Sequence, residues 1–114
     1  MHPIIERHIA AVNAADLDAI AATFADDAFV YDNRREFWGQ AAIRAWLAAE
    51  IVGDHVTMAV TEVLERGGVT VVRAKYDGTY DKTNLPDELI LTNYVTVEAG
   101  RIQTLVTVRV QKIV

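Results

Sequence analysis

The chain has 114 residues, 52% of them hydrophobic, and a formal net charge of −5 at pH 7. This length suffices for one domain with its own core, so we expect a single domain over 1–114. The negative charge argues against nucleic acid and anionic membranes as partners, and the absence of cysteine and serine excludes thiolate and serine-nucleophile chemistry.

The chain shows no secretion signal and no membrane span. No segment reaches the roughly 20 consecutive apolar residues that a spanning helix needs. We therefore expect a cytoplasmic protein.

Two helices are predicted at the start of the chain. Ile5, Ile9 and Val12 recur at helical spacing over 3–13, and Pro3 suits a first helical turn. Asp16 is a suitable N-cap for a second helix. The apolar face of that helix consists of Leu17, Ile20, Ala21 and Phe24.

Short strands and a third helix follow. Asp26 and Asp27 are expected to stop the second helix, and 28–32 reads as a strand. Residues 34–38 form a loop or a second short strand before Gly39. A third helix is predicted over 40–51, with Ile43, Trp46, Leu47 and Ile51 on one side.

The period then changes from helix to strand. Four strands are predicted over 56–64, 69–80, 88–97 and 101–112, with tight connections at 67–68 and 98–100. Helices followed by a strand meander indicate an α+β fold. We expect a curled antiparallel sheet wrapped around the three helices, forming a cone with an internal cavity.

Alternation assigns the strand faces. Val72 and Tyr76 share one face of the second long strand, and Asn93 shares a face of the third with leucines and valines. In the last strand the even positions are mainly apolar, and Thr107 is expected on the opposite face. The outer sheet face still carries β-branched and aromatic residues, so we expect a homodimer through it.

Asp32 is the first candidate for chemistry. It ends an apolar strand row, and a carboxylate among apolar groups has a raised pKa that suits a base near neutral pH. The alternative is a turn aspartate that bonds its own backbone before Asn33.

His8 and Asn93 are the next candidates. His8 stands on the apolar side of the first helix, where a neutral imidazole would donate to a substrate oxygen or relay a proton. The alternative is a core histidine with one internal partner. Asn93 interrupts an apolar row, so its amide either holds a ligand oxygen in the cavity or bonds across the sheet.

Aromatic residues around Asp32 suggest a wall for an apolar ligand. Tyr31, Phe37 and Trp38 flank it, Tyr76 points inward, and Asp81 is expected at the rim. Aromatic side chains are also ordinary core material, and Trp46 is interpreted as packing. No metal-ligand spacing and no phosphate loop is present, so we predict neither a metal nor a cofactor.

Residues 7–32, from Arg-His-Ile-Ala-Ala-Val-Asn to Phe-Ala-Asp-Asp-Ala-Phe-Val-Tyr-Asp, resemble the SnoaL-like and ketosteroid-isomerase branch of the nuclear transport factor two-like superfamily. The resemblance implies that Asp32 is the base that moves a proton beside a ketone. It places the family's oxyanion tyrosine at His8 and its protonated oxyanion aspartate near Asn93, and both replacements can donate hydrogen bonds.

These observations lead to a functional hypothesis. We expect a cofactor-free isomerase or cyclase-type enzyme, in which Asp32 is a general base on an apolar, carbonyl-bearing molecule. The catalytic set would be Asp32, His8 and Asn93, with Tyr31, Phe37, Trp38, Tyr76 and Asp81 binding the substrate. The alternative is a domain that binds a small ligand or dimerises without catalysis.

Overall fold

The computed structural model describes residues 1–109. It begins with two helices, α1 (Pro3–Asn13) and α2 (Leu17–Ala22). Helix α1 confirms the predicted first helix, with Pro3 in its first turn. The Asp16 carboxylate accepts a hydrogen bond from the Ala19 N–H at 3.1 Å, which confirms the predicted N-cap of α2.

The boundary between α2 and the next strand differs from the prediction. Strand β1 spans Phe24–Asp32, so it begins four residues before the predicted strand at Ala28. Phe24 fits the helical spacing of α2, but it is fully buried and pairs with Ile102 in the sheet. Tertiary pairing therefore overrides the local helical pattern at this position.

Strand β2 (Arg35–Trp38) leads into the third helical segment. This segment has two parts, helix α3 (Gly39–Trp46) and a π-helical stretch η1 (Leu47–Val52), where a single helix over 40–51 was predicted. Gly39 begins α3 with φ +81°, a conformation that glycine adopts without steric cost. The wider π turn changes which side chains face the core, and such turns are frequent at functional sites.

Four long strands complete the fold, namely β3 (Thr57–Arg66), β4 (Val69–Asp77), β5 (Leu89–Glu98) and β6 (Arg101–Arg109). The sheet has the order β2-β1-β6-β5-β4-β3. Among the strands of residues 1–109, only the β1–β6 pair is parallel. Positions 110–112 of the predicted last strand lie outside the described residues.

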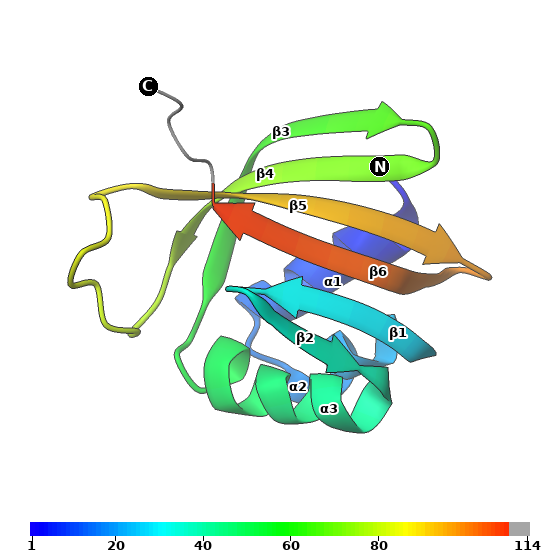
Figure 1. The fold of residues 1–114 in the computed structure, drawn as a ribbon, viewed down its shortest axis with the longest axis horizontal. Coiled ribbons are helices and arrows are strands. Elements are labelled where there is room, and N and C mark those ends of the chain that lie inside the picture. Colours follow the sequence, from blue (N-terminus) through cyan, green and yellow to red (C-terminus); the bar gives the residue numbers. More distant parts are fainter. Residues whose placement is uncertain (110–114) are drawn as a thin grey trace.

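The helices pack on one face of this curled, unclosed sheet (Figure 1). The fold class is α+β, as the sequence predicts, and the predicted meander is extended to six strands because β1 and β2 join it beside β6. Within residues 1–109, no helix is long and apolar enough to span a membrane.

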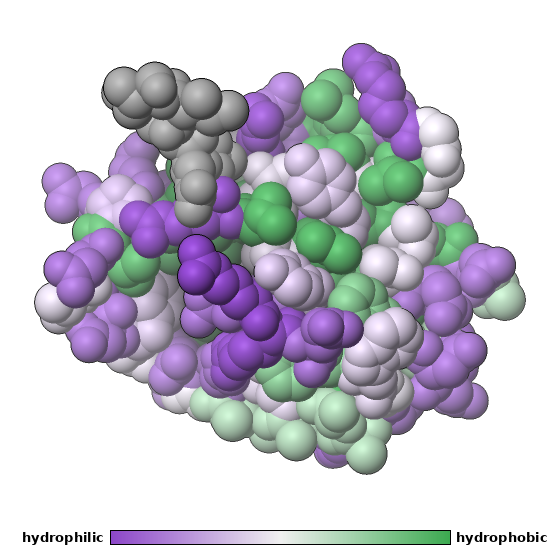
Figure 2. All heavy atoms as spheres, viewed as in Figure 1, coloured by the Kyte–Doolittle hydropathy of each residue, from purple (hydrophilic) through white to green (hydrophobic). Residues whose placement is uncertain are grey.

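The outer face of the sheet carries an apolar row. The strand registers align Leu64, Val71, Tyr94, Val106 and Tyr31 across five neighbouring strands. Leu64 and Tyr94 are 40% and 42% exposed. Figure 2 shows hydrophobic side chains gathered over the middle of this face, between hydrophilic ones at its margins.

The predicted alternation of the last strand is wrong beyond Gln103. Thr96 pairs with Thr104 and Val97 pairs with Ile102, so Gln103 is an extra residue in β6. Such a bulge shifts the alternation by one position. Leu105 and Thr107 consequently face the helices, although Ile102 before the bulge is also buried.

Candidate functional site

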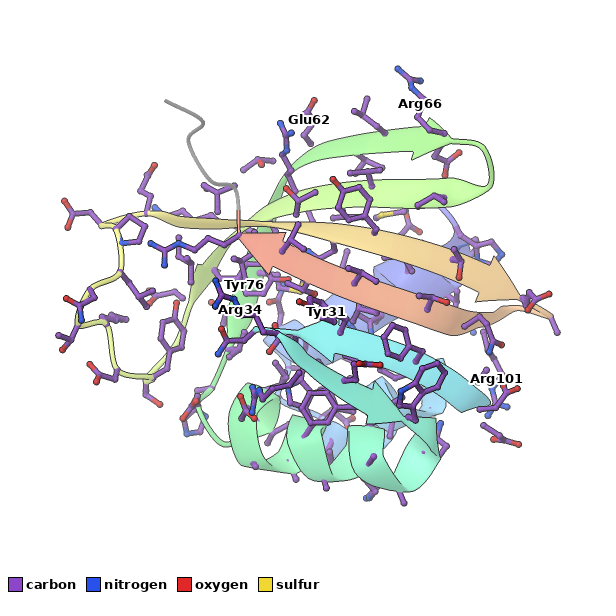
Figure 3. All side chains as sticks on the ribbon, viewed as in Figure 1. Tyr31, Arg34, Glu62, Arg66, Tyr76 and Arg101 are labelled. Carbon is purple, nitrogen blue, oxygen red and sulfur yellow. The ribbon has the colours of Figure 1, made fainter. Side chains whose placement is uncertain are left out.

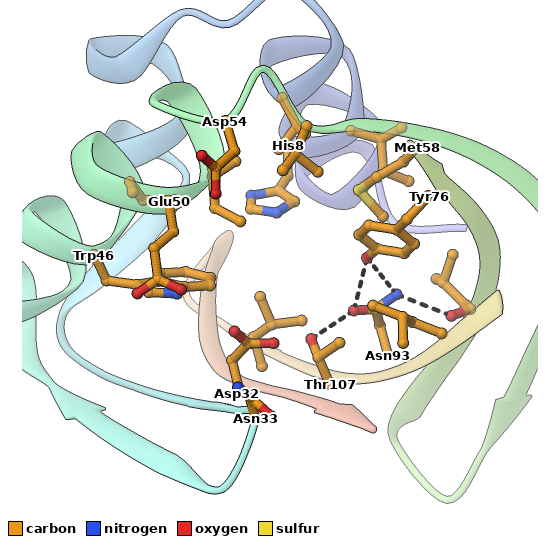
Figure 4. A pocket seen from close by; sticks show the side chains of 18 of the residues that line it. His8, Asp32, Asn33, Trp46, Glu50, Asp54, Met58, Tyr76, Asn93 and Thr107 are labelled. Carbon is orange, nitrogen blue, oxygen red and sulfur yellow. Dashed lines mark hydrogen bonds between the residues drawn. The ribbon is translucent and has the colours of Figure 1, made fainter. Parts of the chain in front are cut away.

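A cavity of about 250 Å³ lies between the inner face of the sheet and the helices. Apolar side chains from α1, η1 and strands β3 to β6 form most of its wall. Its polar groups include His8, Asp32, Tyr76, Asn93 and Thr107 (Figure 4). A largely apolar chamber with few convergent polar groups is typical of a small-molecule site.

One row of the sheet brings the principal polar residues together. Asp32 pairs with Thr107, Thr107 pairs with Asn93, and Asn93 pairs with Val72, on four adjacent strands. Neighbouring strands lie about 4.8 Å apart. Asp32 and Asn93 therefore stand roughly 10 Å apart on the same face, which leaves room for a ring system between them.

The Asp32 carboxyl is buried enough to change its acidity. Desolvation raises its pKa above the ordinary value, the positive charge of Arg35 lowers it, and the negative charge of Glu50 raises it again. The Trp46 indole makes the smallest contribution and also lowers the pKa. Burial dominates, so the pKa of Asp32 lies above that of a solvated turn aspartate, which is the direction that a general base requires.

Arg35 is held chiefly by Glu50. Its two guanidinium nitrogens donate to the Glu50 carboxylate at 2.6 and 2.7 Å, whereas its nearest approach to an Asp32 oxygen is 3.7 Å. A bidentate pair of this kind fixes the guanidinium geometrically. Arg35 still lowers the pKa of Asp32, and the negative charge of Glu50 opposes that effect.

Asn93 forms an internal hydrogen-bond network. Its amide nitrogen donates to the Val72 carbonyl at 3.2 Å, which fixes the orientation of the amide because a carbonyl oxygen only accepts. Its amide oxygen accepts from the Thr107 hydroxyl at 2.7 Å. Asn93 lines the cavity, yet its polar atoms are already engaged within the sheet.

The phenol of Tyr76 completes this network. Asn93 Nδ2 donates its second proton to the Tyr76 oxygen at 2.9 Å. The phenol proton then has two acceptors within reach, the Asn93 oxygen that Thr107 already occupies and an oxygen of a ligand in the cavity. Burial raises the pKa of Tyr76 far above its usual range, so the phenol stays protonated as a donor.

His8 is held in one tautomer. The Thr23 hydroxyl donates to the Ile20 carbonyl at 2.6 Å, so its oxygen accepts from His8 Nδ1 at 3.0 Å. Burial lowers the pKa of His8 to about 4, so the ring is neutral at physiological pH. Its single proton therefore sits on Nδ1, and Nε2 keeps a lone pair.

Four residues predicted to bind substrate lie outside the cavity wall. Tyr31 belongs to the outer row, because it alternates with the inward Asp32 on β1 (Figure 3). Trp38 is 65% exposed and packs on Phe29, with ring centroids 4.3 Å apart. Phe37 points inward but stacks behind Trp46, at 5.5 Å between ring centroids.

Asp81 is the fourth of these residues. It lies exposed in the loop after β4, where its carboxylate accepts from the Thr83 N–H at 2.9 Å. Hydrogen bonds from the backbone and side chain of Thr83 lower the pKa of Asp81. Asp81 is therefore an ordinary Asx-turn residue.

The cavity wall includes residues that were not anticipated from the sequence, Asp54 among them. Thr107 was assigned to the opposite face, Trp46 was interpreted as packing, and Glu50 was not considered, yet all three line the cavity. The Trp46 indole N–H is buried and forms no hydrogen bond among residues 1–109. The available signal in the sequence was the position of Trp46 in the apolar stripe of its helix, one turn before the carboxylate of Glu50.

The described residues also contain no cluster of three or more His, Asp or Glu side chains arranged to hold a metal ion. The carboxylates of Glu50, Glu62 and Asp77 pair instead with arginine or lysine. What the arrangement can do is hold an apolar molecule, donate a hydrogen bond from Tyr76 and exchange a proton with Asp32.

Comparison with known proteins supports the description of the fold. A family model described as a SnoaL-like domain matches residues 5–105. A candidate polyketide cyclase, protein SMa1630 from Sinorhizobium meliloti, is 29% identical over 95% of each chain, with a TM-score of 0.84.

Two more distant structures share the fold. SalBIII, an epoxide hydrolase/cyclase-like enzyme of pyran ring formation in salinomycin, is 21% identical over 94% of this chain and 88% of its own, with a TM-score of 0.80. A protein of ketosteroid isomerase-like fold from Catenulispora acidiphila, in complex with trimethylamine, is 18% identical over 93% and 84%, with a TM-score of 0.78. The chain belongs to the SnoaL-like domain family, and its fold is of the type found in such cyclases and isomerases.

Proposed function

We propose that the cavity carries out cofactor-free proton transfer beside a carbonyl group, in an isomerisation or a cyclisation, with Asp32 as the general base. The observation that carries the proposal is a carboxyl with a burial-raised pKa in the same apolar cavity as a phenol donor. Pairs of titratable groups with such contrasting acidities are characteristic of acid–base catalysis.

In this proposal Tyr76 receives the substrate oxygen. The Asn93 amide nitrogen donates to the phenol oxygen, and the Thr107 hydroxyl orients that amide by donating to its oxygen. The phenol proton, which reaches the Asn93 oxygen at 3.1 Å, turns to the carbonyl of a bound substrate. A donor fixed before the reaction stabilises negative charge that develops on that oxygen without reorganising. Asn93 is thus a positioning residue, and Tyr76 is the group in contact with substrate.

The proton balance is simple. Asp32 removes a proton from the carbon next to the carbonyl and becomes a carboxylic acid, and the two electrons of the broken C–H bond form an enolate. In an isomerisation the acid returns the proton to another carbon. In a cyclisation the enolate carbon attacks a second carbonyl, whose oxygen takes up the proton.

Proton abstraction can be tested before the natural substrate is known. The rate of hydrogen–deuterium exchange at the carbon next to the carbonyl of α-tetralone, followed by NMR in heavy water, measures the first step alone. Asp32→Asn is expected to lower the protein-dependent exchange rate by about 100-fold or more, the usual contribution of a general base. Asp27→Asn, on the exposed side of the same strand, should leave it unchanged.

A fold control accompanies this experiment. A raised native pKa means that the folded state binds the Asp32 proton more tightly than the unfolded state, so its stability falls as pH rises through that pKa. Asp32→Asn removes this cost and should be at least as stable as the wild type at neutral pH. If Asp32→Asn retained the exchange rate of the wild type, the assignment of Asp32 as base would be wrong.

Binding without catalysis is the second candidate function. It is favoured by the predominance of apolar side chains in the wall, which suffices to hold a small molecule. Saturable binding of the tetralone with no protein-dependent exchange would support this alternative over catalysis.

A further inference from the structure

We propose that the molecule taken up by the cavity carries a hydrogen-bond donor, a hydroxyl group, that His8 Nε2 accepts, in addition to the carbonyl that Tyr76 receives. The substrate class would therefore be hydroxy-ketones rather than plain ketones. The carbonyl half of this proposal rests on the proposed function, whereas the hydroxyl half rests on His8 alone.

The proton positions around His8 lead to this conclusion. Thr23 has one hydroxyl proton, which it gives to the Ile20 carbonyl at 2.6 Å. The bond of 3.0 Å between Thr23 and His8 Nδ1 therefore needs its proton from the ring. A neutral imidazole has only one N–H, so Nε2 can only accept.

The surroundings of the ring supply no donor for Nε2. Among residues 1–109, Thr23 is the only hydrogen-bond partner of the His8 ring. Its neighbours in the cavity wall on α1 are the apolar Ile5, Ile9 and Val12, and Phe24 meets the ring edge-on at 5.3 Å between centroids. Nε2 is not among the fully buried unpaired side-chain atoms of the described chain, so it is open to the cavity. Because an acceptor that loses water to a ligand without gaining a donor is costly, the ligand is the natural source of that donor.

The two polar anchors come from different walls. His8 projects from α1 and Tyr76 from β4, and Figure 4 shows both around one cavity with Asp32. Tyr76 offers a proton and His8 offers a lone pair. A ketone without a hydroxyl would accept the Tyr76 proton but would leave His8 Nε2 desolvated and unpaired. A site with both groups therefore discriminates against an analogue that lacks the hydroxyl.

Binding of matched probes tests the substrate class. The dissociation constants of α-tetralone, its phenolic hydroxy isomers and their methoxy ethers are measured by NMR titration, on the wild type and on Asp32→Asn. At least one hydroxy isomer should bind about tenfold more tightly than its methoxy ether and than α-tetralone. Equal affinity within every pair would overturn the proposal.

The His8→Phe variant assigns the preference to its residue. Phenylalanine keeps an aromatic ring against Phe24 but has no acceptor, so the preference for the hydroxy isomer should disappear. Thr70→Val, which alters a buried threonine outside the cavity wall, should keep the preference. A preference that survives in His8→Phe would overturn the role of His8.

The tautomer of His8 is measured directly on the wild type, so this test does not require any variant to fold. Two-bond proton–nitrogen NMR correlations of the His8 ring at neutral pH should show Nδ1 protonated and Nε2 bare. A proton on Nε2, or a charged ring, would overturn the proposal. Loss of proton exchange with an intact hydroxyl preference would instead contradict only the proposed catalysis, so the two failures are distinguishable.

Discussion

At the scale of single residues, the acidity of Asp32 depends on a partner that Asp32 itself does not bind. Arg35 is engaged by Glu50 at 2.6 and 2.7 Å and stands 3.7 Å from Asp32. Burial raises the Asp32 pKa, and the charge of Glu50 adds to that rise. The pKa of Asp32 would thus be raised further by Glu50, which forms an ion pair with Arg35, the cation nearest to Asp32.

Glu50→Gln should lower the Asp32 pKa. The variant removes a negative charge near Asp32 and releases the Arg35 guanidinium toward it, and both changes favour the charged carboxylate. A carboxyl-carbon NMR titration, with the Asp32 signal assigned from Asp32→Asn, measures the pKa. Glu36→Gln, an exposed neighbour on β2, is the control. An unchanged or raised Asp32 pKa in Glu50→Gln would contradict the tuning.

His8 should make the stability depend on pH. Its folded-state pKa of about 4 lies below the ordinary 6.5, so its contribution is complete above pH 6.5. As pH falls from 6.5 to about 4, the unfolded state takes up the proton first, and the free energy of unfolding should drop by about 3 kcal/mol.

Urea unfolding at a series of pH values measures this slope. His8→Phe should lose this part of the slope, because phenylalanine does not titrate. His55→Asn, a change at an exposed histidine with φ 50°, should retain it. Equal slopes in the wild type and His8→Phe would show that His8 is not held neutral.

At the scale of elements, the end of α1 is fastened to the start of β3 by one side chain. The Asn13 amide donates to the Met58 carbonyl at 3.0 Å and accepts from the Met58 N–H at 2.7 Å. The side chain thus pairs with the strand as a neighbouring strand would. This fixes the position of α1, which carries His8, against the sheet, which carries Tyr76.

Asn13→Ala should lower the free energy of unfolding by about 2 kcal/mol, since two hydrogen bonds to the strand are lost. Arg7→Ala, an exposed position of the same helix, should change it by less than about 0.5 kcal/mol. Urea denaturation of both variants makes the comparison. If the two variants had the same stability, the pairing with Met58 would contribute nothing measurable.

At the scale of the whole molecule, the helices cover only one face of the sheet. The outer row, defined above by Leu64, Val71, Tyr94, Val106 and Tyr31, is left without a covering element in the described chain. Apolar rows of this extent on a sheet commonly mark an interface. A second copy of the chain is the partner that we expect there.

Sedimentation at micromolar concentration should show a dimer, and Tyr94→Asp should shift it to a monomer, because a charge at the centre of the row opposes burial. Ala41→Asp adds the same charge on the exposed side of α3 and should leave the dimer intact. A wild-type monomer, or a Tyr94→Asp dimer, would contradict this interface.

Part of this architecture follows from the sequence alone. Local spacing predicted α1, the Asp16 cap and the turns between the long strands, because caps and turns depend on a few adjacent residues. Strict alternation in β4 and β5 correctly predicted that Val72, Tyr76 and Asn93 face the helices. Where a strand is regular, period-two patterning fixes its faces without knowledge of its neighbours.

Long-range pairing decided the remainder. Gln103 is an extra residue in β6 only when β6 is compared with the strands that it pairs with. Because of this bulge, Thr107 lies in the same row as Asp32 and Asn93. Tyr31 was predicted to line the cavity because it is next to Asp32 in the sequence. Adjacent residues of a strand face opposite sides of the sheet, so Tyr31 faces outward.

The same holds for the acid–base network. Glu50 reaches Arg35 and the cavity through a π-helical stretch that the helical pattern of 40–51 did not reveal. The tautomer of His8 depends on Thr23, 15 residues along the chain. The sequence by itself determined the elements and the regular strand faces, since these are local properties. Tertiary structure decided which polar groups meet and which of them gives or takes the proton, because hydrogen bonds between distant segments form only once packing has aligned them.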